Sequence, residues 1–422
     1  MSHLPQLLLL LIVIIASAKL AAAASTRLGQ PAVFGEIFVG LVLGPTVLNM
    51  LTWPVFAIAV PGGGHGTDLK PFLGDLSELG VILLMFVAGL ETDVAEMRRV
   101  GRIAFWTAAG GVVLPLAGGA AVASAFGLPF FWEGLFIGTI LTATSVSISA
   151  QTLMELGALR SREGATILGA AVIDDVMGII LLSLVVAFAR SVGSIDYLTL
   201  TFIVARMAAF FVLAFVAARL LPSVGRWAER LGVSQGLLAA VLAITFGYAW
   251  AAEYVGGVAA ITGAYLAGVG FGQTSFKSRI DAGIHPLTYS MLVPVFFVGI
   301  GLQANGRELG GHVLFTLAIV LVAIVAKAVG CGGAARMLGF TGRESVRVGA
   351  GMISRGEVGL IIASYGLVHG IIGHDVFSAS VIMVLATTMV TPPLLRATFP
   401  RGIRPDTGFV EESIAGPPEP GA

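Results

Sequence analysis

The chain has 422 residues, of which 57% are hydrophobic and only 11% are charged, and its formal net charge is zero. A soluble protein of this size carries about 25% charged residues, so the composition excludes an ordinary soluble fold, and without a basic tract nothing supports nucleic-acid binding. The single cysteine, Cys331, excludes an intramolecular disulfide. Apolar runs of roughly 20 residues recur along the whole chain, which indicates an all-α, polytopic membrane protein.

We expect about thirteen transmembrane helices. The apolar segments fall at residues 4–22, 29–50, 75–96, 103–126, 133–157, 163–189, 197–221, 235–253, 255–273, 286–304, 312–335, 346–368 and 375–395. The short apolar stretch 53–60 runs into a Pro-Gly sequence and is expected to be a loop or an interfacial piece. Residues 1–400 then form one transmembrane unit, and the Pro- and Gly-rich tail 401–422 is too short to be a domain.

Positive charges are distributed unequally between the loops that join these segments. Seventeen of the 24 Lys and Arg residues fall in alternate loops, and only Lys70, Arg190 and Arg307 fall in the others. Cytoplasmic loops carry the excess of Lys and Arg, so we expect a cytoplasmic C-terminal tail and, from the odd number of segments, an external N-terminus. Residues 7–18 could instead belong to a cleaved signal peptide, but no Lys or Arg precedes them, and cleavage would place the seventeen charges on the wrong side.

Two adjacent aspartates, Asp174 and Asp175, lie in the middle of the apolar segment 163–189. A carboxylate at membrane depth is costly unless something compensates it, so intramembrane acids mark ion or proton paths. Neighbouring carboxylates also repel each other, which raises the affinity of at least one of them for a proton or a cation. Lys327 lies near the centre of the segment 312–335, and one of the aspartates is its nearest candidate partner. Snorkelling of the lysine toward an interface is the alternative.

The two halves of the chain resemble each other at a constant offset of seven segments. The matching stretches are 35–44 with 263–272, 86–91 with 297–303, and 142–148 with 354–360. Because seven is odd, the two units would have opposite orientations in the membrane, which is the inverted repeat typical of secondary transporters. Chance similarity between glycine-rich membrane helices is the alternative explanation.

Polar runs interrupt two of the apolar segments. The first run contains Thr142, Thr144 and Ser145, and the second contains Arg355 and Glu357. Hydroxyl-mediated helix packing would explain the first run alone, but beside the buried charges both runs predict discontinuous helices, whose free carbonyls and helix ends face an ion. We expect Arg355, Glu357 and Thr142 to support these broken helices.

The remaining polar residues carry no assignment. Glu36 and Glu91 lie within apolar segments, and their roles stay open. The sequence contains no Cys/His zinc spacing, phosphate-binding loop or nucleophile elbow. We therefore expect neither an enzyme nor a cofactor.

Taken together, these motifs resemble the cation:proton antiporters, in the Na+/H+ exchanger and Kef-like branch of the monovalent cation:proton antiporter-2 type. The resemblance covers nearly the whole chain and is carried by Gln30, 35–36, 43–45, 86–91, 142–145, 173–175, Lys327, 354–357 and 391–393. It implies a homodimer in the lipid membrane. Segments 1–3 and 8–10 would form a dimerisation domain, segments 4–6 and 11–13 a mobile core in which the broken helices cross, and residues 197–221 a linker helix.

The Asp-Asp form with an intramembrane lysine resembles the electrogenic Na+/H+ exchangers. We therefore expect exchange of Na+ or Li+ for H+ across the bacterial inner membrane, by alternating access of the core domain. Asp175 would be the main cation ligand, assisted by Asp174, Thr144 and Ser145, and Asp174 would pair with Lys327 when the site holds no Na+. K+/H+ antiport or a Kef-like K+ efflux pathway remains the main alternative. A non-transporting scaffold is a weaker one, because the set of ionisable residues is intact.

Overall fold

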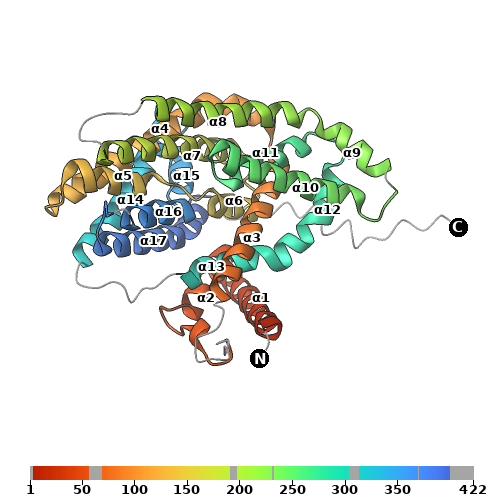
Figure 1. The fold of residues 1–422 in the computed structure, drawn as a ribbon, viewed down its shortest axis with the longest axis horizontal. Helices are drawn as coiled ribbons and strands as arrows, with labels where there is room; N and C mark the ends of the chain where they lie inside the picture. Colours follow the sequence, from red (N-terminus) through yellow and green to blue (C-terminus); the bar gives the residue numbers. More distant parts are fainter. Residues whose placement is uncertain are drawn as a thin grey trace.

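The computed structural model describes residues 3–56, 69–190, 197–230, 232–303, 313–368 and 370–399. Within these residues the chain is all-helical and contains no strand (Figure 1). Ten of the described helices are long and apolar enough to cross a membrane, and three shorter apolar helices coincide with the predicted segments 2, 9 and 12. The predicted fold class is confirmed, whereas the count of thirteen transmembrane helices stays a prediction. The predicted tail, residues 401–422, lies outside the described residues.

The helices pack in two groups. The first group consists of α1 (His3–Arg27), α2 (Ala32–Leu43), α3 (Leu69–Glu91), α10 (Gly236–Trp250) with a π-helical extension (Ala251–Gly256), α11 (Ala260–Gly272), α12 (Lys277–Leu287), a π turn (Thr288–Leu292) and α13 (Val293–Gln303). The second group consists of α4 (Val94–Ala125), a π turn (Phe130–Gly134), α5 (Leu135–Thr142), α6 (Val146–Glu155), α7 (Arg162–Arg190), α14 (Val313–Met337), α15 (Gly342–Gly351), α16 (Glu357–Val368) and α17 (His374–Thr398).

Packing is dense within each group and sparse between them. Helix α3 packs along α11 and α2 along α13 in the first group, while α4 packs along both α14 and α7 in the second. Contacts between the groups run mainly through α6, which touches α2 and α3, and through α17, which touches α2. The grouping follows the predicted segments 1–3 and 8–10 against 4–6 and 11–13; their roles as dimerisation and core domains stay predictions.

Two further helices connect the groups. Helix α8 (Tyr197–Ala218) contacts both α7 and α11, and α9 (Leu221–Arg230) leads from it to α10 (Figure 1). Helix α8 corresponds to the predicted linker helix, residues 197–221. It ends slightly earlier than expected, because the chain turns at residues 219–220 before the shorter α9 begins.

Helix α2 is shorter than the predicted segment 29–50. It ends at Leu43, and Gly44 is extended, with φ −74° and ψ −176°. The next residue is Pro45, whose ring disfavours a helical conformation in the residue before it. A short 3-10 turn (Met50–Thr52) follows, so the apolar residues after Gly44 lie outside the helix.

Glycines let α4 and α14 cross in direct backbone contact. A Cβ atom on Gly110 would lie 2.3 Å from the carbonyl oxygen of Gly330, and one on Gly330 would lie 2.2 Å from that of Gly110. Small residues at such crossings are the usual means of close helix packing in membranes. This crossing brings Lys327 of α14 against the backbone of α4, where its ammonium donates to the carbonyl of Gly111 at 2.9 Å.

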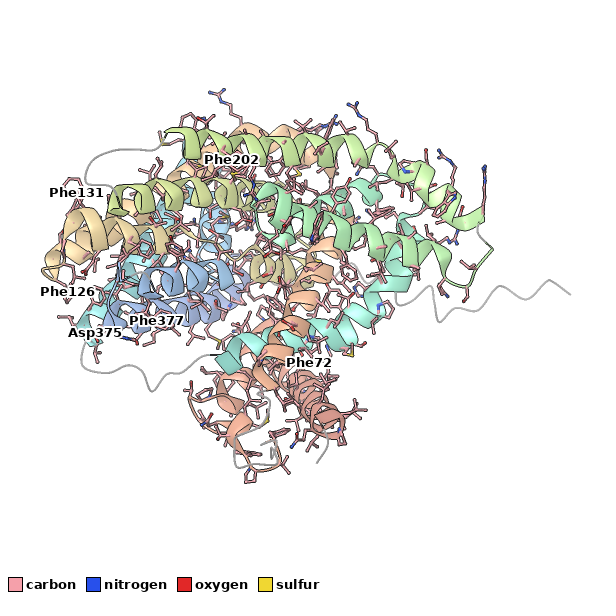
Figure 2. The ribbon with its side chains drawn as sticks, viewed as in Figure 1. Phe72, Phe126, Phe131, Phe202, Asp375 and Phe377 are labelled. Atoms are coloured by element: carbon pink, nitrogen blue, oxygen red, sulfur yellow. The ribbon has the colours of Figure 1, made fainter. Side chains whose placement is uncertain are left out.

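Large apolar side chains lie on the outside of the bundle. Phe126, Phe131 and Phe202 are exposed, and Phe126 and Phe131 are seen at one end of the bundle (Figure 2). A water-soluble monomer rarely exposes apolar surface on this scale, whereas a bilayer is the medium in which such side chains are favourable. The surface therefore agrees with the apolar helices in indicating a multi-pass membrane protein.

Candidate functional site

Two helical segments of the second group are interrupted in their middle. Helix α5 ends at Thr142 and α6 begins at Val146. Helix α15 ends at Gly351 and α16 begins at Glu357. We call residues 143–145 the first break and residues 352–356 the second break. The discontinuous helices predicted from the polar runs are therefore present.

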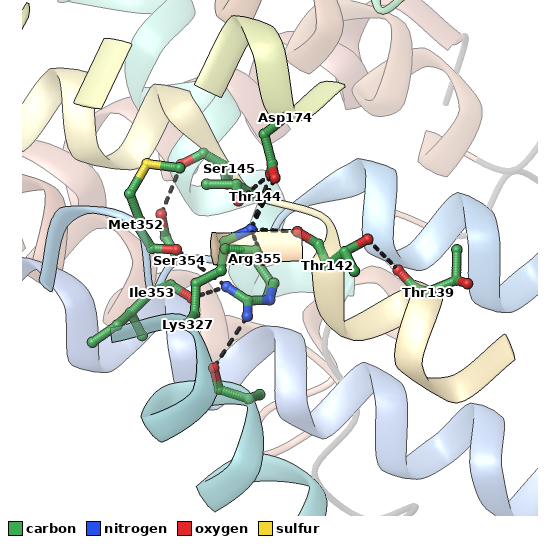
Figure 3. A network of polar contacts seen from close by, with 12 residues as sticks. Thr139, Thr142, Thr144, Ser145, Asp174, Lys327, Met352, Ile353, Ser354 and Arg355 are labelled. Carbon is green, nitrogen blue, oxygen red and sulfur yellow. Dashed lines mark hydrogen bonds and ion pairs between the residues drawn. The ribbon is translucent and has the colours of Figure 1, made fainter. Parts of the chain in front are cut away.

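The two breaks lie against each other (Figure 3). The backbone N–H of Ser145 donates to the carbonyl of Ser354 at 2.9 Å, and the Ser354 hydroxyl donates to the carbonyl of Ser145 at 2.7 Å. A Cβ atom on Gly356 would lie 2.7 Å from the Ser145 side chain, so this contact requires a glycine. The bonds pair backbone groups that the breaks leave without helical partners, which an interior position demands.

A fully buried ion pair lies at the first break. The Lys327 ammonium on α14 is 3.1 Å from both carboxylate oxygens of Asp174 on α7, and it also donates to the carbonyls of Thr142 at 2.6 Å and Gly111 at 2.9 Å (Figure 3). The Thr144 hydroxyl donates to the same carboxylate at 2.6 Å. Both charges thus have hydrogen-bonding partners, without which a buried ion pair is strongly unfavourable.

The other polar residues in and beside the first break make local contacts. The Thr142 hydroxyl donates to the carbonyl of Thr139 at 2.8 Å, so its side chain bonds within α5 while its own carbonyl faces Lys327. The Ser145 and Ser147 hydroxyls lie 3.2 Å apart. The break therefore collects hydroxyl and carbonyl oxygens, which are the ligand types that hard cations prefer.

A buried guanidinium occupies the second break. Arg355 donates to the carbonyls of Met352 at 3.2 Å, Ile353 at 2.5 Å and Ala323 of α14 at 3.1 Å (Figure 3). These donors take the place of the backbone N–H groups that a continuous helix would have supplied. The side chain of Glu357, also predicted to support the break, lies outside the described residues, although its backbone begins α16.

Asp175 contacts the first helix group. The Thr262 hydroxyl on α11 donates to its carboxylate at 3.1 Å. The structure therefore brings Asp174, Lys327 and Thr144 together. The Thr144 hydroxyl bonds to Asp174, whereas the sequence analysis predicted that it would assist Asp175. Thr262 was not predicted; its only signal is a polar residue inside the apolar segment 255–273.

A second polar contact between the groups was also missed. Glu155 at the end of α6 accepts the backbone N–H groups of Ala32 at 2.6 Å and Val33 at 3.2 Å, so its carboxylate caps the N-terminus of α2. Glu36, whose role the sequence left open, is buried on α2 and lies 3.4 Å from the Lys19 ammonium. The acidic residue at the end of the segment 133–157 was the available signal for Glu155.

Comparison with known proteins assigns the chain to a family. Residues 11–399 match the family described as sodium/hydrogen exchanger, transmembrane. The chain is 42% identical over 376 residues to the Na+/H+-K+ antiporter GerN of Bacillus cereus, across 89% of this chain and 92% of GerN. It is 34% identical over 373 residues to a Na+/H+ antiporter of Enterococcus hirae, across 88% of this chain and 92% of that protein. These relatives favour Na+/H+ exchange over the K+/H+ alternative.

The fold is similar to a solved structure as well. The sodium proton antiporter MjNhaP1 from Methanocaldococcus jannaschii superposes with a TM-score of 0.66, across 93% of this chain and 97% of MjNhaP1. The two sequences are 14% identical, so this likeness concerns the fold alone.

Proposed function

This chain belongs to the sodium/hydrogen exchanger family and exchanges Na+ for H+ across the membrane, and we propose that Asp175, Asp174 and Lys327 perform the exchange. The observation that carries the proposal is the fully buried Asp174–Lys327 ion pair beside the first break, between α5 and α6. Ionisable groups at membrane depth mark ion and proton pathways, and a backbone break beside them supplies carbonyl ligands.

In the proposed cycle, Na+ or Li+ binds to the Asp175 carboxylate with oxygens of Thr144, Ser145 and Asp174. As the cation binds, Asp175 gives up its proton, and Lys327 leaves Asp174 and gives up a second one. On the return leg Asp175 and Lys327 each take a proton, and the Asp174–Lys327 pair forms again. Cation and protons compete for the same carboxylates, which couples the two fluxes. With two protons per Na+, one net charge crosses the membrane in each cycle, worth about 2.3 kcal/mol per 100 mV.

The proposed movement is alternating access of the second helix group, which contains both breaks, against the first. Dense packing inside each group and sparse contacts between them support this division. We further propose that the first group forms a homodimer interface within the lipid bilayer, as the family resemblance implies. The cycle transports ions without converting a substrate, so the proposed protein is a transporter that needs no cofactor.

The test of the site is Asp175→Asn in proteoliposomes. The amide can neither ionise nor bind a proton for exchange, so Na+-dependent proton flux should be abolished while the purified protein still unfolds at the wild-type temperature. Asp75→Asn on the exposed surface of α3 is the matched control and should retain the flux. Retained flux in Asp175→Asn contradicts the site. Running the assay with Na+, Li+ and K+ in turn tests selectivity, and K+ working as well as Na+ would restore the K+/H+ alternative.

We propose a plasma-membrane orientation with the C-terminal tail in the cytoplasm, supported by the excess of Lys and Arg in alternate loops. Single cysteines in a Cys331→Ser background test it. Cysteines near Arg99 and Arg226 should resist an impermeant thiol reagent added outside the cell, whereas cysteines near Lys70 or Arg307 should react. The opposite labelling pattern would invert the orientation.

A further inference from the structure

We propose that Thr262 is a positioning residue for the exchange: its hydroxyl holds Asp175 against the first helix group and has to release the carboxylate before a cation occupies it. This inference rests on the proposed role of Asp175 as the exchanging carboxylate.

The hydrogen bond joins the two helix groups. Thr262 lies in the first turn of α11, which packs on α3 and α10, whereas Asp175 lies on α7, which packs on α4 and α5. The hydroxyl donates to Oδ2 of Asp175 at 3.1 Å, and the Thr262 side chain is buried. Asp174, one residue earlier on the same helix, instead bonds to Lys327 and Thr144 inside the second group. Asp174 is therefore bound within the second group, whereas its neighbour Asp175 has a hydrogen bond across the boundary to the first group.

Thr262, like Thr144, uses its hydroxyl differently from the buried threonines that bond within their own helix. Thr245 on α10 donates to the carbonyl of Val241, four residues earlier in the same helix, at 2.8 Å. Thr288 donates likewise to Ile284 at 2.9 Å. Such bonds within a helix are the usual arrangement for membrane threonines. A hydroxyl has one proton to donate, and Thr262 directs it to a carboxylate on another helix.

This bond competes with the cation. An oxygen that accepts the Thr262 proton has fewer lone pairs to offer to Na+, and the donor stabilises the ionised carboxylate without an ion. In the proposed cycle, cation binding exchanges this bond for ion coordination, so the bond lowers the apparent affinity for Na+. Because it is lost before the ion-loaded state forms, its removal alters the affinity and leaves the rate of the loaded carrier unchanged.

The experiment measures Na+-driven proton flux in proteoliposomes as a function of Na+ concentration. Thr262→Val removes the hydroxyl at nearly constant volume, and the KM for Na+ should fall about tenfold, equivalent to about 1.4 kcal/mol, while kcat stays within about twofold of wild type. Thr262→Ser keeps a hydroxyl and should restore the wild-type KM. Thr262→Ala is a second variant without the hydroxyl, for use if the valine protein does not fold, and should lower KM in the same way.

Thr245→Val is the matched control. It removes a buried hydroxyl from the same helix group without touching Asp175, so its KM should equal that of wild type. A KM that rises in Thr262→Val would make the hydroxyl a cation ligand and overturn the proposal, and so would an unchanged KM or a failure of Thr262→Ser to restore it. If one of these results is obtained while the wild type is active and Asp175→Asn is inactive, only the role of Thr262 is overturned, and the proposed function stands. Flux retained in Asp175→Asn overturns the proposed function and this inference with it.

Discussion

Each helix break leaves backbone carbonyls in the protein interior, and at each one a fully buried basic side chain donates to them. At the first break, Lys327 bonds to the carbonyl of Thr142 at the end of α5, and it also bonds to the carbonyl of Gly111 on α4. At the second, Arg355 bonds to the carbonyls of Met352 and Ile353. The repeat predicted from the sequence pairs the two broken segments with each other, but Lys327 reaches the first break from α14, whereas Arg355 is itself part of the second break.

The two cations differ in what else they bind. Lys327 also contacts both oxygens of Asp174, whereas the third hydrogen bond of Arg355 goes to the carbonyl of Ala323. An ammonium gains or loses its proton when its surroundings change, but a guanidinium stays charged in proteins. We therefore expect charge to change at the first break during the proposed cycle, and the second break to be a fixed support.

The largest expected effect comes from Arg355→Leu. The buried carbonyls of Met352 and Ile353 lose their donor, and each such loss costs about 1–3 kcal/mol, so the protein should be destabilised by about 3–5 kcal/mol. Thermal unfolding of the detergent-solubilised protein measures this. If the break is a support only, the fraction that folds should keep the wild-type dependence of flux on membrane potential. A change in that dependence would mean that Arg355 takes part in the charge movement.

Lys327→Gln should destabilise less and alter function more. The amide still donates to the carbonyls, and Asp174 can take a proton, so the expected loss is about 2–3 kcal/mol. Because the titratable ammonium is gone, exchange should stop or become nearly electroneutral. The assay compares Na+-driven proton movement with and without a potential clamped by valinomycin and K+. A mutant that responds to the potential as strongly as wild type would reduce Lys327 to a structural counter-ion, like Arg355.

The smallest effect is expected at the start of α15, which leads into the second break. Thr341 and Glu344 form a capping box, with the Thr341 N–H on the Glu344 carboxylate at 2.7 Å. Thr341→Ala should cost about 1 kcal/mol of stability and leave transport unchanged.

The Thr341 backbone N–H, and then its side chain, lower the pKa of Glu344. The contribution of the Glu344 carboxylate to the stability of the fold is therefore complete above its unfolded-state pKa and is lost as pH falls through its folded-state pKa. Glu344→Gln should remove this pH dependence from thermal unfolding curves.

The buried charges were predictable from the sequence, and the partners of the hydroxyls were not. Asp174, Lys327 and Arg355 stand out because ionisable residues are rare within apolar segments, and two charges of opposite sign in the interior must find each other or other polar groups. The breaks were predictable from hydroxyl, glycine and charged residues gathered in otherwise apolar segments.

Thr262 and Glu155 could not be found in the same way. A threonine in a membrane helix bonds to its own backbone by default, so its presence does not reveal which helix it faces. Glu155 lies at a segment end, where a solvated carboxylate is equally reasonable. In both cases the partner depends on how the two helix groups pack against each other. The repeat pattern in the sequence gives no information about that packing.

The crossing of α4 and α14 limits which mutations can be compensated by a second-site substitution. At Gly118, farther along α4, an added Cβ would meet the Val322 side chain, 2.6 Å away, so a smaller residue at position 322 is an available suppressor. At Gly110 and Gly330 the obstacle is the other helix's carbonyl oxygen, which every amino acid possesses. No second-site substitution can remove it. The contact that positions Lys327 therefore has no compensatory partner, and selection can only keep it or lose it.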